Sequence, residues 1–315
     1  MTALDKRTGT KQPATAARSG GRRKGVGVSQ SVETALGWRT GSNHIVSMAL
    51  RGVLSLVALL LFAGPLIVLF SGAFDKNPDP TKLSLIPNSP TLSNFTLAGE
   101  RGVWHYLGNS LVIAGGGLLL QVSVSVFAAY ALARKRFRGR AIISMLFLIT
   151  MMLPEEVIAI PLSLIIGDIP VLHISLKGTL VGMILPLGAW GFSIFVMTEF
   201  MRELPIELEE AARIDGAGEM RIFAQIILPL CRPALGVITV FGFIMIWDQY
   251  LLPLIVANDP SDYPLSVALS TLRSDTTGPG LVLAGALLAL VPSLVVYLLL
   301  QKSLISGMTA GALKG

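Results

Sequence analysis

Six long apolar runs alternate with polar segments along this chain, and each is long enough to cross a bilayer. A spanning helix needs about 20 predominantly apolar residues. The predicted spans are Gly52–Ser71, Ser110–Ala133, Ala141 to about Ile166, Thr179–Phe200, Pro233–Ala257 and Leu281–Lys302. Pro154 and Pro161 break the third run, which is tolerable where neighbouring helices satisfy the freed backbone groups. The pattern predicts an all-α polytopic membrane protein with six transmembrane helices in residues 46–315.

Composition supports a membrane location. Apolar residues make up 52% of the 315 residues and charged residues 14%, whereas a soluble domain carries roughly 25% charge. A surface facing water could not be covered with so few charges, and the mean hydropathy of +0.69 agrees. The single cysteine, Cys231, excludes an intrachain disulfide, and the three scattered histidines do not support a zinc site.

The basic residues predict the orientation. Residues 1–45 are basic and lack apolar periodicity, so we expect a disordered tail, and the first apolar run is too long and too late for a signal peptide. With both ends inside, 20 of the 25 Lys and Arg residues fall in cytoplasmic segments. The positive-inside rule therefore predicts a multi-pass protein of the cell membrane with both termini cytoplasmic. Membrane topology accounts for the net charge of +6, and no nucleic-acid partner is expected.

One cytoplasmic segment, about residues 201–231, is charged and compact. From Pro205 onward apolar residues recur at helical spacing with acidic residues between them. Gly216 and Gly218 are predicted to end this short helix, and a second helical segment should begin near Phe223 and close at Pro229. The acidic face suits a groove on a soluble partner better than the anionic inner leaflet. An ordinary interhelical loop is the alternative.

The same segment resembles the signature loop of ABC importer permeases. The matching positions are Glu210, Ala211, Ala212, Gly216, Ile226, Leu228 and Pro229, spaced as in that family. Three further stretches, Asn109–Leu111, Tyr130–Arg140 and Gly307–Gly315, resemble the carbohydrate branch of maltose and glycerol-3-phosphate permeases. The resemblance covers roughly residues 50–315.

The resemblance implies a type I ABC importer transmembrane domain with several partners. These are a second permease, two cytoplasmic ABC ATPase subunits that bind ATP and magnesium, an extracytoplasmic solute-binding protein and membrane lipid. It also implies that the C-terminal Thr309–Gly315 can reach the ATPase interface. A phosphate-binding P-loop needs a Gly-Lys pair, and this chain contains none. We therefore expect a non-catalytic subunit that binds no cofactor itself.

Within the signature loop, residue chemistry suggests how an ATPase would be gripped. Glu210 and Asp215 can pair with the partner, Ala211 and Ala212 permit close approach, and Gly216 and Gly218 let the chain turn. These six residues are the predicted ATPase-coupling site.

Two polar groups within the spans are candidates for the solute path. Glu155 and Glu156 follow Pro154, and a charge near the bilayer centre costs about 2.5–3.5 kcal/mol on insertion scales. The alternative is a helix break near the membrane edge, with both glutamates solvated. The second group is Trp247, Asp248, Gln249 and Tyr250, whose aromatic faces and hydrogen-bonding groups suit sugars. The alternative here is helix packing between permeases.

The sequence does not define the substrate. Related permeases often have Trp-Asn where this chain has Trp247 and Asp248. Glu155, Glu156 and Asp248 would repel an anionic solute from the path and so favour a neutral sugar or polyol. The sequence resemblance is divided between sugar permeases and glycerol-3-phosphate permeases.

Two other classes of protein fit the sequence less well. A six-span secondary transporter or channel would be favoured by inverted repeats, and the two halves of this chain contain no convincing repeat. An intramembrane enzyme would need a nucleophile paired with a base, or metal-ligand spacing, and neither accompanies the acidic residues.

Overall fold

The computed structural model describes the backbone of residues 44–79, 84–273 and 278–312, and the side chains of these ranges except 44–46 and 302–312. The predicted tail of residues 1–45 lies outside the described residues except for its last two, which begin a helix. The side chains of Thr309–Gly315 also lie outside them.

The chain divides into two compact units, residues 1–60 and residues 61–315. Helix α2 (His44–Ala73) crosses this boundary and starts earlier than the predicted Gly52. In the first unit its described apolar side chains, such as Leu54 and Leu59, are more than half exposed, as expected of a helix surrounded by lipid or by another protein.

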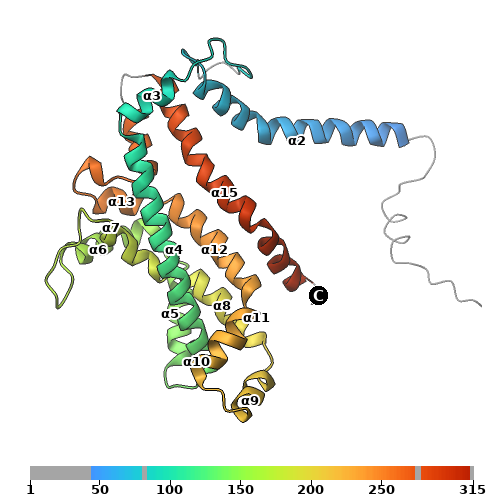
Figure 1. The fold of residues 1–315 in the computed structure, drawn as a ribbon, viewed down its shortest axis with the longest axis vertical. Helices are drawn as coiled ribbons and strands as arrows, with labels where there is room; N and C mark the ends of the chain where they lie inside the picture. Colours follow the sequence, from blue (N-terminus) through green and yellow to red (C-terminus); the bar gives the residue numbers. More distant parts are fainter. Residues whose placement is uncertain (1–43, 80–83, 274–277, 313–315) are drawn as a thin grey trace, which may run out of the picture. The chain divides into compact units, whose positions relative to one another are not determined.

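The second unit is built around α4 (Val103–Arg134), α8 (Gly191–Glu203), α12 (Arg232–Trp247) and α15 (Pro279–Ala312). Helix α12 packs against both α4 and α15, and α4 packs along α8, so these helices lie side by side (Figure 1). Among the described residues no strand forms, and the β-type pairing consists of two isolated bridges. The all-α prediction is confirmed.

Six spans are also consistent with the structure, with two of them bent. Four helices are long and apolar enough to cross a membrane, and the number rises to six if each bent helix pair forms one span. The third predicted run is such a pair, α5 (Arg140–Thr150) and α6 (Glu155–Gly167), which meet at 110°. Pro154 lies between them in extended conformation. The helix is interrupted here because proline lacks an N–H and disfavours helix in the residue before it.

The fourth and fifth runs also divide into shorter helices. The fourth contains α7 (Leu180–Ile184), the 3-10 helix η1 (Leu185–Gly188) and α8. The fifth contains α12, which ends at Trp247, and α13 (Leu251–Val256). The remaining elements are α3 (Ser93–Glu100), η3 (Pro260–Asp262) and α14 (Leu265–Arg273).

The segment between α8 and α12 contains α9 (Glu207–Ile214), α10 (Glu219–Ile222), the π-helix η2 (Phe223–Ile227) and α11 (Leu228–Leu230). Three predictions for this segment were wrong. The second helical segment begins at Glu219, in α10, and not near Phe223. Gly218 begins α10 as its N-cap instead of ending α9. Pro229 lies inside α11, and the chain turns by 74° only after Leu230, because proline is accepted in the first turn of a helix.

Among the described residues three buried clusters hold these helices together, and the third of them joins α3 and α4 to α14 and α15. The other two lie nearer the segments considered below. The first lies beside the segment after α8 and includes Met197, Met201, Ile222, Ile227 and Ile238. The second joins α4 to α7, α12 and α13 through Ile113, Met183, Phe243, Ile246 and Val256. Many other apolar side chains stay exposed, which is normal for helices whose solvent is lipid.

Candidate functional site: the α9 loop and a polar cavity

Helix α9 ends in a hydrogen-bonded turn that explains part of the signature spacing. Gly216 has a φ of +80°, a conformation that glycine adopts readily. The Ala217 N–H donates to the Ala212 carbonyl at 2.9 Å, and the Gly216 N–H donates to the Arg213 carbonyl at 3.1 Å. This pair of bonds is a Schellman motif. The distance in sequence between Ala212 and Gly216 therefore sets how the helix stops.

The side chains of α9 divide into an inward and an outward set. Ala212 is only 8% exposed and packs in the first buried cluster, so the close approach to a partner predicted for both alanines applies to Ala211 alone. Glu210, Ala211, Ile214 and Asp215 are exposed. Ile214 is 87% exposed, an apolar side chain between the exposed charged residues Arg213 and Asp215.

Glu209 is the charged residue that the sequence reasoning missed. It is fully buried, and its carboxylate lies 3.1 Å from the guanidinium of Arg134, the last residue of α4. This contact is an ion pair whose geometry is too bent for a hydrogen bond. Arg134 also donates to the Leu204 carbonyl at 2.8 Å, and Arg213 donates to Glu209 at 3.1 Å. The ends of α4 and α8 are thus joined to α9.

A second, exposed set of contacts surrounds this pair. Glu219, the first residue of α10, accepts hydrogen bonds from the Tyr130 hydroxyl at 2.9 Å and from Arg213 at 3.2 Å. Lys135 also pairs with Glu219 and lies over the Tyr130 ring. Because Arg213 contacts both glutamates, α4, α9 and α10 are linked by one charged network.

A cavity of about 270 Å³ lies where α6, η1, α12 and α13 meet. Glu155, the first residue of α6, and Gln249, which follows α12, both line it, and these two side chains interact. The other lining side chains are mostly apolar and include Trp190, Met245 and Leu252. The cavity therefore offers one acidic and one amide group inside an apolar wall.

The other four path candidates lie elsewhere. Trp247 donates its ring N–H to the Ala289 carbonyl at 3.2 Å and stacks on Phe243, so it packs against α15. The Tyr250 hydroxyl contacts the Ser270 hydroxyl at 3.2 Å. Asp248 and Glu156 are exposed and do not line the cavity. The structure thus brings together two of the six candidates.

Over the ranges that the structure describes, no group of three or more His, Cys, Asp or Glu side chains lies close enough to hold a metal ion.

With this geometry in view, comparison with known proteins identifies the class. The family model described as "Binding-protein-dependent transport system inner membrane component" matches residues 121–304. The chain belongs to this family, whose members are permease components of ABC importers. A solved structure of a bacterial ABC transporter that imports alginate has the same fold, with a TM-score of 0.72, 23% identity, and coverage of 84% of this chain and 98% of that one.

Curated relatives place the chain in the carbohydrate branch. The maltodextrin transport system permease protein MdxG of Bacillus subtilis is 33% identical, covering 87% of this chain and 97% of that protein. The sn-glycerol-3-phosphate permease UgpE of Yersinia pestis is 33% identical, with coverage of 81% and 94%. The diacetylchitobiose permease DasC of Streptomyces coelicolor is 31% identical, with coverage of 83% and 96%. The resemblance predicted from the signature loop is confirmed, and a secondary transporter is not supported.

Proposed function

We propose that this permease moves a neutral sugar or polyol into the cytoplasm, driven by ATP hydrolysis in separate ATPase subunits that grip α9. Its partners would be a second permease, two ABC ATPases with ATP and magnesium, and an extracytoplasmic solute-binding protein. Both termini and α9 would face the cytoplasm, as the distribution of Lys and Arg predicts.

The observation that carries this proposal is the exposure of Ile214 on a helix that is otherwise firmly attached. An apolar side chain in water contributes nothing to folding, but it stabilises a complex when a partner covers it. Glu210 and Asp215 flank it on the exposed surface and would pair with basic groups of the ATPase. The buried Glu209–Arg134 pair would pass a movement of α9 directly to α4.

The solute class is argued from the cavity. The Glu155 carboxylate accepts hydrogen bonds, and the Gln249 amide both donates and accepts them, which suits the hydroxyl groups of a sugar or polyol. A negatively charged solute would be repelled by Glu155. The names of the relatives agree with this class in two cases, maltodextrin and diacetylchitobiose, while the third, sn-glycerol-3-phosphate, is the competitor.

Gentle purification of the tagged chain from its native membrane tests the proposal, with every accompanying chain identified by mass spectrometry. An ATP-binding subunit and a second permease are expected with the wild-type chain. The Ile214→Ser variant should lose the ATPase subunit and keep the second permease. Met220→Ser, which removes another exposed apolar side chain outside α9, is the matched control and should keep both.

A chain that purified alone and transported solute in vesicles without ATP would overturn the proposal. Equal ATPase recovery with Ile214→Ser and wild type would overturn the role of α9 and leave the importer class intact.

A further inference from the structure

Another site with charged side chains lies outside both α9 and the 270 Å³ cavity lined by Glu155 and Gln249. A groove of about 680 Å³ runs between the first turns of α5 and the last turn of α8, and we call it the Arg140–Arg202 groove after its two charged residues. Its volume falls within the range of about 300–1,000 Å³ that is usual for small-molecule sites. Arg202 is followed almost directly by α9, so the groove lies at the same end of the spans as the coupling loop.

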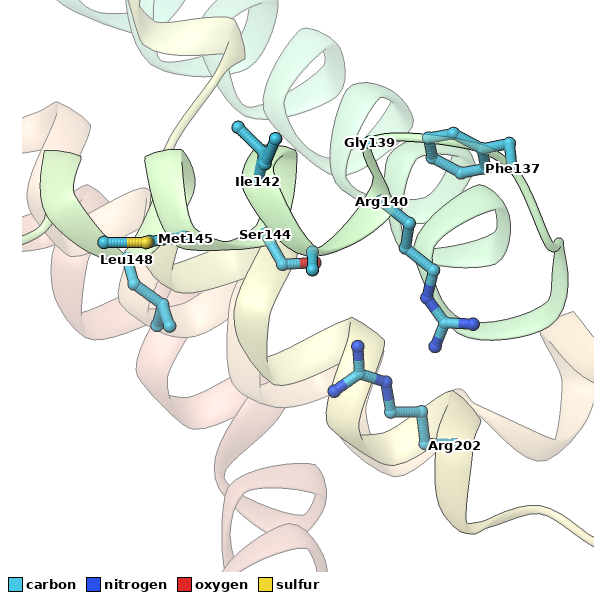
Figure 2. Close-up of a pocket in the computed structure, with 9 residues that line it drawn as sticks. Phe137, Gly139, Arg140, Ile142, Ser144, Met145, Leu148 and Arg202 are labelled. Carbon is cyan, nitrogen blue, oxygen red and sulfur yellow. The ribbon is translucent and has the colours of Figure 1, made fainter.

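The groove concentrates positive charge without an equal number of acidic groups. Figure 2 shows the guanidinium groups of Arg140 and Arg202 pointing toward one another. Arg202 pairs with Glu199 at 2.6 Å. Arg140 makes no ion pair with any residue in the described part of the chain, and its nearest acceptor, the Lys135 carbonyl, is 3.5 Å away. The two guanidiniums therefore keep a surplus positive charge that an anion would offset.

Two further groups in the groove can donate hydrogen bonds to an anion. Helix α5 begins at Arg140 behind Gly139, and no side chain caps its first turn, so its first N–H groups are open to a negatively charged ligand. The Ser144 hydroxyl is buried and has no hydrogen-bond partner among the described residues, and Ser144 lines the groove.

The rest of the wall is apolar and continues along α5. Ile142, Met145 and Leu148 line the groove and are 66%, 62% and 43% exposed. A soluble anion would leave this wall in contact with water, whereas a lipid acyl chain would cover it. Basic pockets between transmembrane helices at the cytoplasmic face bind anionic lipid headgroups.

We propose that the Arg140–Arg202 groove binds one anionic phospholipid, with its phosphate on the two guanidiniums and the first turn of α5 and an acyl chain along Ile142, Met145 and Leu148. The assignment to the cytoplasmic leaflet rests on the orientation given under the proposed function. Recognition of the headgroup does not depend on that orientation or on ATP.

Native mass spectrometry of the intact detergent-solubilised complex tests this, with phosphatidylglycerol and phosphatidylcholine of identical acyl chains as probes. Wild type should retain phosphatidylglycerol at least tenfold better than phosphatidylcholine. The double variant Arg140→Gln/Arg202→Gln should retain at least fivefold less phosphatidylglycerol than wild type. Arg138→Gln is the control, because it removes one positive charge two residues from Arg140 without lining the groove, and it should retain the lipid.

Three results would overturn the proposal: equal retention of both lipids, equal loss in Arg138→Gln and the double variant, or displacement of phosphatidylglycerol by inorganic phosphate. The last result would assign the groove to a free anion.

A second measurement covers the case in which the double variant fails to assemble. Met145→Trp places a fluorescent reporter on the apolar wall, and brominated phosphatidylglycerol should quench its added signal at a lower lipid fraction than brominated phosphatidylcholine. Equal quenching by the two lipids would exclude headgroup recognition. Absence of quenching by either would show that protein, such as the second permease, covers the groove, and would overturn the proposal.

Discussion

The carboxylate of Glu209 lies 3.1 Å from the guanidinium of Arg134, and the two side chains are only 1% and 5% exposed. Burying two charges is costly, and their attraction offsets this cost only while both are present. Arg134 ends α4 and Glu209 belongs to α9, so the pair holds the coupling helix against a transmembrane helix.

Removing one member of this pair should destabilise the protein far more than removing both. We expect Arg134→Met to cost about 3 kcal/mol, the low end of the range for a broken buried pair, because Glu209 loses its buried partner and keeps only the more exposed Arg213. Arg134→Met/Glu209→Leu should recover most of this loss. Thermal unfolding of the complex in detergent ranks the variants by stability. Arg202→Met, which breaks the exposed pair with Glu199, is the control and should cost about 1 kcal/mol or less. Equal loss in Arg134→Met and Arg202→Met would contradict the buried pair.

Gly216→Trp should abolish uptake while leaving membrane insertion intact. A Cβ atom at Gly216 would meet no atom within 4 Å, so the space beside it is open and a docked partner is what a large side chain there would obstruct. The strain of a φ of +80° is a separate effect, and Gly216→Asn controls for it because asparagine tolerates this conformation. Asn should keep most of the uptake. Wild-type uptake with Trp would mean that no partner approaches the end of α9.

Charge reversal on the exposed face of α9 should also uncouple the transporter. Glu210→Lys is expected to reduce uptake strongly, since the new ammonium would meet the basic groups proposed for the ATPase. Glu207→Lys makes the same change on the same helix outside the signature positions and should be milder. Uptake and solute-stimulated ATP hydrolysis in reconstituted vesicles separate the two variants, and identical losses would argue for a general charge effect.

The sequence predicted the ends of α9 better than its faces. A glycine is itself a local signal for the end of a helix, so Gly216 alone was enough to predict where α9 stops. The burial of Glu209 has no local signal, because a glutamate among acidic neighbours resembles an exposed residue until Arg134, far away in sequence, is brought beside it. Ile214, although apolar, is 87% exposed, which the spacing of the apolar residues does not indicate.

The adjacent glutamates of α6 should differ in their effect on transport. Both side chains are exposed, but only Glu155 lines the 270 Å³ cavity. Glu155→Gln should raise the KM for a neutral sugar severalfold by weakening hydrogen bonds to its hydroxyls, and Glu156→Gln should leave it unchanged. Uptake titrations in vesicles provide the test. A rise in KM with Glu156→Gln alone would place the solute path elsewhere.

Hydropathy predicted the third span as a single run because it depends on the composition of a segment and not on the direction of its helix axis. The bend of 110° after Thr150 depends on the backbone at Pro154, and it is this bend that points Glu155 toward Gln249. The same limit applies to Trp247 and Tyr250, whose polar atoms found partners on α15 and α14. Their residue types fitted a sugar path, but packing decided where they point.

The loop after α2 should lose order at acid pH. The Asp75 carboxylate accepts hydrogen bonds from the backbone N–H groups of Asn77 and Asn88, at 3.1 and 2.6 Å, and these hold its pKa below the ordinary value of 3.8. Because the pKa is depressed in the folded state, the stabilisation is complete above the ordinary value and is lost as the pH falls through the lower, folded value.

Hydrogen exchange at the Asn88 amide measures this opening. Protection should fall in the acid range for wild type and should vary less for Asp75→Asn, which has no carboxylate to protonate. An equal pH dependence in both proteins would assign the opening to other groups.

The π-helix at Phe223–Ile227 affects how this chain should be aligned with its relatives. A π-turn holds one residue more than an α-turn, and each residue of an α-helix turns the chain by about 100°. If these residues wound as a plain α-helix, everything after them would rotate, and Ile227 would leave the cluster that it shares with Ile222. A relative that lacks the π-turn should therefore be one residue shorter here, which would break the spacing from Gly216 to Leu228 and Pro229. Relatives that keep the signature spacing should therefore also keep the π-turn at residues 223–227.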